Sequence, residues 1–197
     1  MNKKTKLIIQ IALLVMIVLF IINQQELFFT SKSAYRHMER YIHFGPATEL
    51  YTSDNIEGRY ILAEYDDWIA VFNFYQRYGL FYTPASMVGE LKIDNEKDVT
   101  FRVVSYYFAD NEMHFVLWAY AKEPNTTLEV QRSDGSTFTM KSFTDHIHFG
   151  HWPSEDQTSA GIRPASIQGY DAEGQLVYEE EIEYNNNLEF YNHNPSY

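Results

Sequence analysis

The pattern of hydrophobic and polar positions divides the chain into three parts, and the first part is a continuous apolar run. Leu7–Ile22 reads LIIQIALLVMIVLFII, in which Gln10 is the one polar residue among 16 positions. A helix rises about 1.5 Å per residue, and a membrane span needs roughly 17–25 apolar residues. The run is close to that length and is apolar on every side, whereas a core helix is apolar along one stripe. The pattern therefore predicts a transmembrane anchor at residues 7–22.

The residues on either side of this run indicate its orientation and whether it is kept. Three lysines precede it within residues 1–6, and lysine collects on the cytoplasmic side of membrane spans. We therefore expect a cytoplasmic N-terminus and a C-terminal body outside the cytoplasm. A cleaved signal peptide is the alternative, but its cleavage site favours small residues just after the run. The sequence there is NQQELFF, and the first pair of small residues is Ser31 and Ser33.

The second part, residues 23–57, is predicted to form a stalk and one amphipathic helix. Within Leu27–Phe44 apolar residues recur near helical spacing, and Thr30, Ser31 and Ser33 are suitable N-caps. A Gly-Pro pair follows and ends the helix. Because its apolar stripe needs cover, we expect this helix to pack on the body.

The third part begins at residue 58, where the hydrophobic period becomes that of β-strands. Arg59–Tyr65 and Trp68–Tyr75 are rich in aromatic and branched residues and are separated by an Asp-Asp turn. A glycine turn leads into Leu80–Thr83, and Pro84 confines the next segment to a sheet edge or a loop. These segments predict a small antiparallel meander at residues 58–88.

Residues 89–184 predict a β-sandwich-like unit. Asp110-Asn111 and Ser133-Asp134-Gly135 are turn signals between strand-like segments. The segment from Gly89 to Lys97 is expected to be a polar connection, and Ser142–Arg163 is expected to be irregular. The Asn-rich tail, 185–197, is expected to fray. The expected strands are Val99–Ala109, Glu112–Ala121, Thr126–Arg132, Ser136–Lys141, Ala165–Tyr170 and Gln175–Tyr184.

The predicted fold is mainly β, of the α+β class. It contains an N-terminal transmembrane helix, one amphipathic helix, an antiparallel β-meander and a β-sandwich-like exported domain. The hairpin over residues 99–121 is apolar on parts of both faces, so we expect it to be central. Whether the body is one β domain or two small ones stays open at this point.

Three segments carry a resemblance to known proteins: Ser33–Ile42, the meander at Ile61–Tyr82, and IQGYDAEGQLVYE at Ile167–Glu179. Their order resembles that of small membrane-anchored exported proteins of Gram-positive, spore-forming bacilli. The resemblance is one of layout and covers most of the exported part. Those proteins are of unknown function. The resemblance therefore implies a location in the bacterial envelope and transfers no catalytic residue.

Composition and charge narrow the possible partners. The chain has no cysteine, which excludes disulfides, thiolate metal sites and cysteine nucleophiles. Beyond residue 25 there are 27 acidic residues against 12 lysines and arginines. This charge repels nucleic acid phosphates and anionic lipid headgroups, so we expect no nucleic acid partner. The excess of acidic residues is also typical of an exposed domain that is kept soluble by its charge.

The densest cluster of candidate ligands is DHIHFGH, residues 145–151. If this segment is extended, His146 and His148 lie on one face, and His151 or Asp145 could complete a site for zinc or another divalent metal. The alternative is a surface loop whose histidines titrate near neutral pH. The sequence contains no H-E-x-x-H motif that would favour the metal site.

Other signals for chemistry are weaker. Glu179, Glu181 and Glu183 alternate along one strand face and could bind calcium, although a solvated outer face explains the same pattern. There is no G-x-S-x-G motif and no phosphate-binding glycine loop. The leading hypothesis is a non-enzymatic binding or accessory module, anchored in the membrane, with a protein or cell-wall partner. The alternative is an envelope metal-binding protein or metal-dependent enzyme that uses His146, His148 and His151.

Overall fold

The computed structural model describes residues 2–53, 59–107, 113–153 and 162–182, and the described chain is mainly β. Two helices come first, α1 (Lys3–Gln24) and α2 (Ser31–Tyr41). The strands that follow form three antiparallel sheets of four strands each. The predicted class, mainly β with two helices, is confirmed.

The three sheets follow the chain in order, except that strands β9 and β10 return to the second sheet. Sheet A has the order β1 (Thr48–Thr52), β2 (Arg59–Tyr65), β3 (Trp68–Arg77), β4 (Phe81–Lys92). Sheet B has the order β5 (Val99–Tyr107), β6 (Met113–Ala121), β10 (Ile147–Pro153), β9 (Lys141–Ser142). Sheet C has the order β12 (Leu176–Glu181), β11 (Pro164–Tyr170), β7 (Thr127–Arg132), β8 (Thr137–Thr139).

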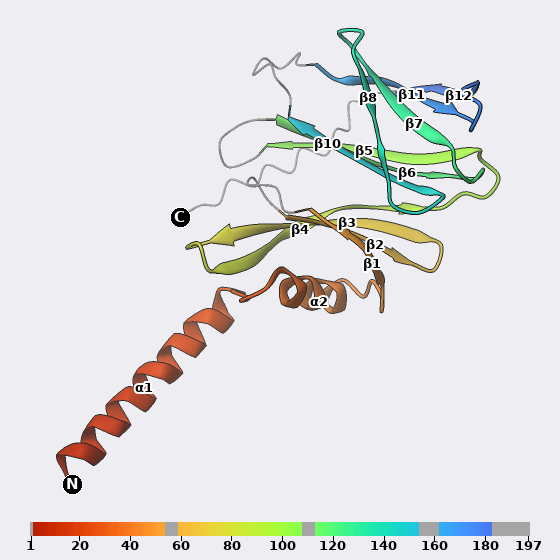
Figure 1. The fold of residues 1–197 in the computed structure, drawn as a ribbon. Coiled ribbons are helices and arrows are strands. Elements are labelled where there is room, and N and C mark those ends of the chain that lie inside the picture. Colours follow the sequence, from red (N-terminus) through yellow and green to blue (C-terminus); the bar gives the residue numbers. More distant parts are fainter. Residues whose placement is uncertain (1, 54–58, 108–112, 154–161, 183–197) are drawn as a thin grey trace.

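The sheets and α2 stack as four layers, with α2 under sheet A, then sheet B, and sheet C farthest from α1 (Figure 1). Three apolar clusters lie between these layers. Sheet B is covered on both faces, because alternate residues of β6 enter different clusters: Val116 and Trp118 face sheet A, and Phe115 and Leu117 face sheet C. The expectation of a central hairpin at residues 99–121 is therefore confirmed.

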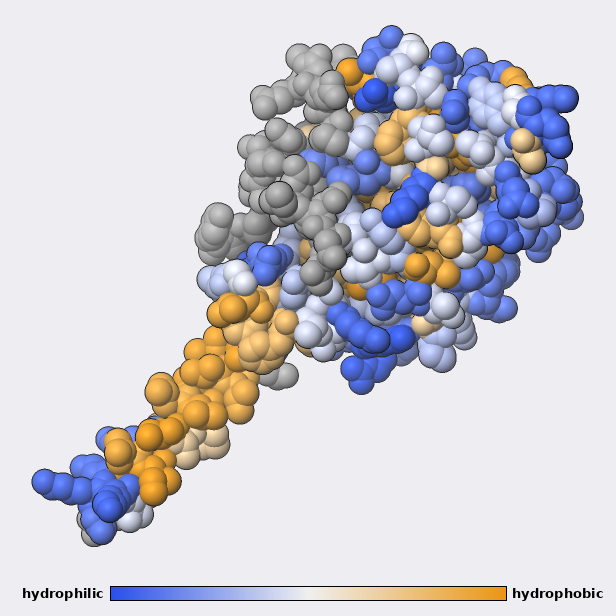
Figure 2. Space-filling model, in the orientation of Figure 1, coloured by the Kyte–Doolittle hydropathy of each residue, from blue (hydrophilic) through white to orange (hydrophobic). Residues whose placement is uncertain are grey.

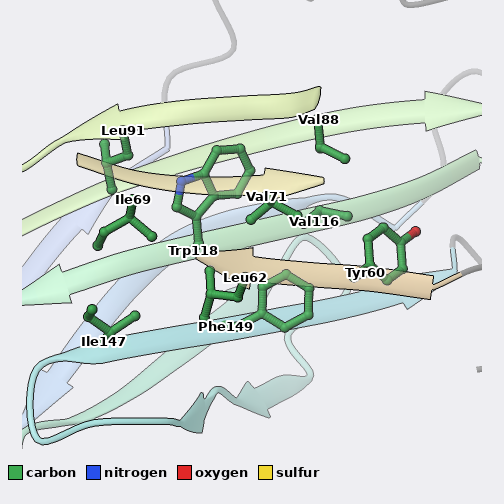
Figure 3. Packing of buried hydrophobic residues seen from close by; sticks show 10 residues of the cluster. All are labelled: Tyr60, Leu62, Ile69, Val71, Val88, Leu91, Val116, Trp118, Ile147 and Phe149. Atoms are coloured by element: carbon green, nitrogen blue, oxygen red, sulfur yellow. The ribbon is translucent and has the colours of Figure 1, made fainter. Parts of the chain in front are cut away.

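The cluster between sheets A and B joins the predicted meander to the predicted sandwich. Trp118 lies at its centre among residues of β2, β3 and β4 (Figure 3). Gly89 makes this packing possible, since a Cβ there would lie 2.9 Å from the Trp118 ring. The two units thus share a hydrophobic core, and their layers pack directly on each other.

Helix α2 forms where its N-cap and apolar stripe predict it. The Thr30 side chain accepts a hydrogen bond from the Ser33 backbone N–H at 3.1 Å and so caps the first turn. Ala34 and Tyr35 are fully buried against sheet A, and Tyr35 contacts Phe72 edge to face. Glu39, also buried, accepts the Ala47 N–H at 2.5 Å and fixes the turn that follows the helix.

The observed boundaries differ from the predicted ones in three places. Strand β1 lies in the segment predicted as stalk and helix, 23–57. Strand β4 passes through Pro84, at the sheet edge as expected, and continues to Lys92, so the predicted boundary between 88 and 89 falls within a strand. Strand β10 lies in the segment expected to be irregular. The turn at Asp110-Asn111 and the tail 185–197 lie outside the described residues.

Helix α1 has no cover from the described part of the body. It is exposed from Lys3 to Ile21, and it extends from the body as an apolar rod with a hydrophilic N-terminal end (Figure 2). Within the described residues it is the one helix that is long and apolar enough to cross a membrane, as predicted for residues 7–22.

Candidate functional site

The predicted histidine cluster lies along β10, in the middle of sheet B. This strand pairs with β6 from Ile147↔Tyr120 to Pro153↔His114 and with β9 at His148↔Ser142. Because successive residues of a strand point to opposite faces, His148 shares a face with Trp152, which packs in the cluster toward sheet C. His151 points to the opposite face, toward sheet A. The structure therefore separates His151 from His148.

His146 lies just before β10, next to the end of β6. Its Nδ1 lies 2.9 Å from the carbonyl oxygen of Ala121, and since a carbonyl can only accept, Nδ1 carries the proton. The ring stacks on Tyr120 at 5.5 Å between centroids. This hydrogen bond leaves the Nε2 lone pair as the basic position of His146, which is the tautomer that metal-binding histidines commonly adopt.

His148 is the most buried of the three predicted ligands. It is 1% exposed, and neither ring nitrogen has a hydrogen-bond partner among the described residues. Burial, and to a smaller extent the nearby His146, lowers the pKa of His148 to about 4. His148 is therefore neutral at pH 7. Its unpartnered nitrogens make it costly to bury, more so once protonated.

His151 pairs instead with a histidine that the sequence analysis did not select. Nε2 of His151 lies 3.1 Å from Nδ1 of His114, and the two rings are nearly parallel. One nitrogen must donate and the other accept, so at least one ring is neutral at that position. Burial, followed by the charge of His114, lowers the pKa of His151 to about 4. The Tyr60 ring packs at 4.8 Å from His151, within the core between sheets A and B.

The signal for this pair was present in the strand pattern. His114 alternates with Val116 and Trp118 on β6, so it shares their face toward sheet A. What the pattern lacked was the pairing of β10 with β6, which sets His151 diagonally across from His114. Register between segments more than 30 residues apart is decided by tertiary packing, so the local pattern could not supply it.

The metal hypothesis stays a prediction after this geometry. His146 and His148 lie near each other, whereas His151 faces the other core. Among the described residues no group of three or more His, Asp or Glu side chains is arranged to hold a metal ion. The structure describes two of the three glutamates considered for calcium binding. Glu179 and Glu181 lie exposed on β12, and Glu179 accepts a hydrogen bond from Gln168. Glu183 lies outside the described residues.

The surface of sheet C offers a second candidate location. Two adjoining depressions, of about 520 and 670 Å³, share Glu181 and Ile182. Arg102 lines one, and Arg163 and Ser166 line the other. Both are open. The first is lined by charged and apolar side chains of β5 and of the end of β12, and the second also by the small polar side chains of Ser133 and Ser166. Such surfaces suit a polar partner, since they lack the enclosed apolar wall of a small-molecule site.

No protein family matches the chain, and no curated protein or solved structure is significantly similar to it.

Proposed function

We propose that the chain is a single-pass membrane protein of the bacterial envelope, whose β body acts outside the cytoplasm as a non-enzymatic binding or accessory module. The observation that carries the proposal is α1, whose residues 7–22 are apolar except for Gln10 and receive no cover from the described part of the body, which buries most of its other apolar elements. Exposing such a helix to water is unfavourable, and a bilayer removes that cost.

The charge before α1 supports the proposed orientation, and features of the β body support a non-enzymatic binding role. Lys3, Lys4 and Lys6 favour a cytoplasmic N-terminus. The layout shared with anchored exported proteins of bacilli supports an envelope location. The described titratable groups with strongly lowered pKa values, His148 and His151, are packed inside the cores. The open depressions beside β12, with mixed charged and apolar linings, support binding of a protein or wall partner rather than chemistry in a pocket.

Two measurements test the anchor and its orientation. Protease added to intact, wall-stripped cells should degrade the body and leave a cytoplasmic marker whole. The N-terminus of the membrane form should begin near Met1. A protected body would contradict the orientation, and a membrane form that starts near Ala34 would show that a signal peptide had been cleaved.

The binding role needs its own test. The full chain, extracted from its native membrane in mild detergent, should migrate in a complex larger than itself. A chimera with residues 1–30 before an unrelated soluble domain serves as the matched control and should migrate alone. A full chain that also migrates alone would contradict the accessory role.

Metal binding is the second candidate function, and one observation favours it. His146, just before β10, lies near enough to His148 to contribute to the lowered pKa of His148, and the hydrogen bond to Ala121 leaves Nε2 of His146 as the basic atom. Zinc would require a third ligand from outside the two histidines. A zinc-dependent rise in melting temperature that disappears on replacing both histidines with Ala would support this candidate.

A further inference from the structure

Exposed apolar side chains gather where α1 joins the body. Phe29 follows the end of α1 by five residues and is 67% exposed. Tyr78 and Leu80, in the turn between β3 and β4, are 73% and 69% exposed. We call Phe29, Tyr78 and Leu80 the anchor-proximal patch. In Figure 2 the hydrophobic surface of α1 continues onto the adjoining part of the body.

Backbone hydrogen bonds fix this turn to the end of the anchor. Phe28 and Tyr82 exchange two hydrogen bonds, with N···O distances of 2.8 and 2.6 Å. The residues next to this pair, Phe29 and Phe81, also touch, because the centroids of their rings lie 5.0 Å apart. The turn therefore lies beside the upper end of α1 (Figure 1). Any membrane that α1 crosses must lie close to it.

The length of α1 sets the height of the patch above the hydrocarbon. Its apolar run, residues 7–22, spans about 24 Å, somewhat less than the hydrocarbon thickness of about 30 Å, so the end of α1 lies no higher than the headgroup layer. The headgroup layer adds roughly 5–8 Å on each side. Leu80 is two residues from Tyr82, a strand distance of about 7 Å. A turn tied to Phe28 is thus within reach of the headgroup layer.

The backbone of the turn is unusual for the residue it holds. Tyr78 has φ +53° and is followed by Gly79 at φ +66°. Consecutive left-handed residues suit a tight hairpin, but Asn, Asp or Gly normally occupy the first position. The neighbouring β2–β3 turn follows that rule with Asp66 at φ +55°. A bulky aromatic held in this conformation, with its ring in solvent, points to a role for the ring itself.

Charges near the patch are basic, unlike those of the rest of the body. Lys32, Arg36 and Arg40 are spaced four apart and so lie on one face of α2. Arg77 is exposed at the turn. The acidic groups on this side are Glu26, which lies 3.7 Å from His37, Glu39, which is buried against Arg36, and Glu49, whose charge also acts on Arg36; the balance with the four basic residues stays positive. This surface would attract anionic headgroups, although the body as a whole would repel them.

We propose that the anchor-proximal patch inserts among the lipid headgroups, so that the β3–β4 turn is a second membrane contact that sets the orientation of the body. Aromatic and apolar residues flanked by Lys and Arg are the composition that favours the interface of a bilayer. The inference rests on the proposed membrane anchor. With two contacts instead of one, the body is held at a defined angle and sheet C points away from the membrane.

Fluorescence quenching on the full chain in vesicles of phosphatidylcholine and phosphatidylglycerol tests the inference. Because the chain has no cysteine, Leu80→Cys, Leu176→Cys and Val15→Cys each create one labelling site. Leu176 is the matched control, an apolar residue that is 51% exposed on β12. A nitroxide lipid labelled near the headgroup should quench the fluorophore at position 80, whereas aqueous iodide should quench it at position 176 and not at position 80.

The label at position 15 separates the two levels of the proposal. If it is shielded from iodide while position 80 is open to iodide, the anchor stands and the patch inference is overturned. If position 15 is open to iodide, α1 does not span the bilayer and the proposed function itself fails. A label at position 80 that is shielded from both quenchers is covered by protein, which also overturns the lipid contact.

Two further variants probe the chemistry of the contact. Tyr78→Ser in the Leu80→Cys background should reduce lipid quenching, because the aromatic partner in the interface is lost. Lys32→Glu should reduce it in vesicles with phosphatidylglycerol and leave it unchanged in pure phosphatidylcholine. Equal quenching in all these samples would overturn the proposed contribution of the patch and its basic surroundings.

Discussion

The two ends of the body differ in the charge of the side chains that lie near their exposed apolar residues. Near the anchor, Tyr78 and Leu80 lie on the same side of the body as basic side chains of α2 and β3. At the far end, Leu176 and Val177 of β12 precede three exposed glutamates, Glu179, Glu180 and Glu181. The two ends thus expose similar apolar side chains but carry opposite local charge. Under the proposed membrane contact, an anionic membrane surface would attract the near end and repel the far end.

The same division follows from the packing. Sheet A contributes its faces to two cores and leaves its β3–β4 turn at the anchor, while sheet C uses one face for a core and exposes the other. Sheet B joins them through Trp118 and Leu117 on its two faces. The body is therefore one packed stack whose two ends differ in their chemistry.

The first prediction tests whether the two ends share one folding unit. Trp118→Ala should lower the free energy of unfolding by about 3–5 kcal/mol, and Leu128→Ala in the other core by about 2–5 kcal/mol. Both residues are fully buried. Urea unfolding of the full chain in detergent, followed by circular dichroism, should show one transition in each variant. Two transitions after Trp118→Ala would mean that the near and far layers fold independently. Val177→Ala, at an exposed site, should change stability by less than about 0.5 kcal/mol.

The second prediction concerns acid, which should weaken both cores. His151 lies between sheets A and B and His148 faces sheet C, and each has a folded pKa of about 4 against an ordinary value of 6.5. Between those pH values the unfolded chain binds more protons than the folded one. The contribution of the two neutral histidines to the free energy of unfolding is therefore fully present above pH 6.5. It is lost as the pH drops toward 4, by up to about 3 kcal/mol for each group.

Urea titrations at pH 7 and pH 4.5 measure this loss. His148→Leu, which replaces the imidazole with an apolar side chain of similar size, should reduce the loss by the share of one histidine. His43→Gln, at an exposed position, is the control and should leave the loss unchanged. A pH dependence that is identical in wild type and His148→Leu would contradict the assignment of His148.

The third prediction is confined to the near end. Thr30→Ala removes the hydroxyl that caps α2 and should cost about 1 kcal/mol. The residue is exposed, so the substitution changes little else. Hydrogen exchange should show faster opening of α2 in the variant, with β7 and β11 of sheet C unchanged. Equal acceleration in α2 and in these two strands of sheet C would show that the near layer does not open on its own.

The smallest expected effect is that of zinc. Under the binding-module proposal, zinc should leave the melting temperature of the full chain within experimental error. A real site with free metal at 100 times its dissociation constant would add about 2.7 kcal/mol. A rise that disappears in the His146→Ala, His148→Ala double variant would favour the metal-binding alternative. It should then also fade as the pH falls toward 4, where the His148 imidazole protonates.

Local sequence patterns determined most of the elements. The all-round apolar run gave α1, the caps and stripe gave α2, and β-branched and aromatic segments bounded by turn residues gave the hairpins at β2–β3, β5–β6, β7–β8 and β11–β12. These predictions held because each depends on residues close in sequence, where side-chain periodicity and turn chemistry act directly. The expectation that residues 99–121 are central held because a strand apolar on both faces must be covered twice.

The tertiary structure decided what depends on distant partners. Ser142–Arg163 has few local strand signals, yet its segment Ile147–Pro153 becomes β10 because β6 offers an open edge and two cores to fill. That pairing sends His148 and His151 to opposite faces and brings His151 to His114. The Phe28–Tyr82 bridge likewise joins residues 54 positions apart and carries the β3–β4 turn to the anchor. Hydrogen bonds and buried area between distant segments set such contacts, and neither is encoded in the pattern of one segment alone.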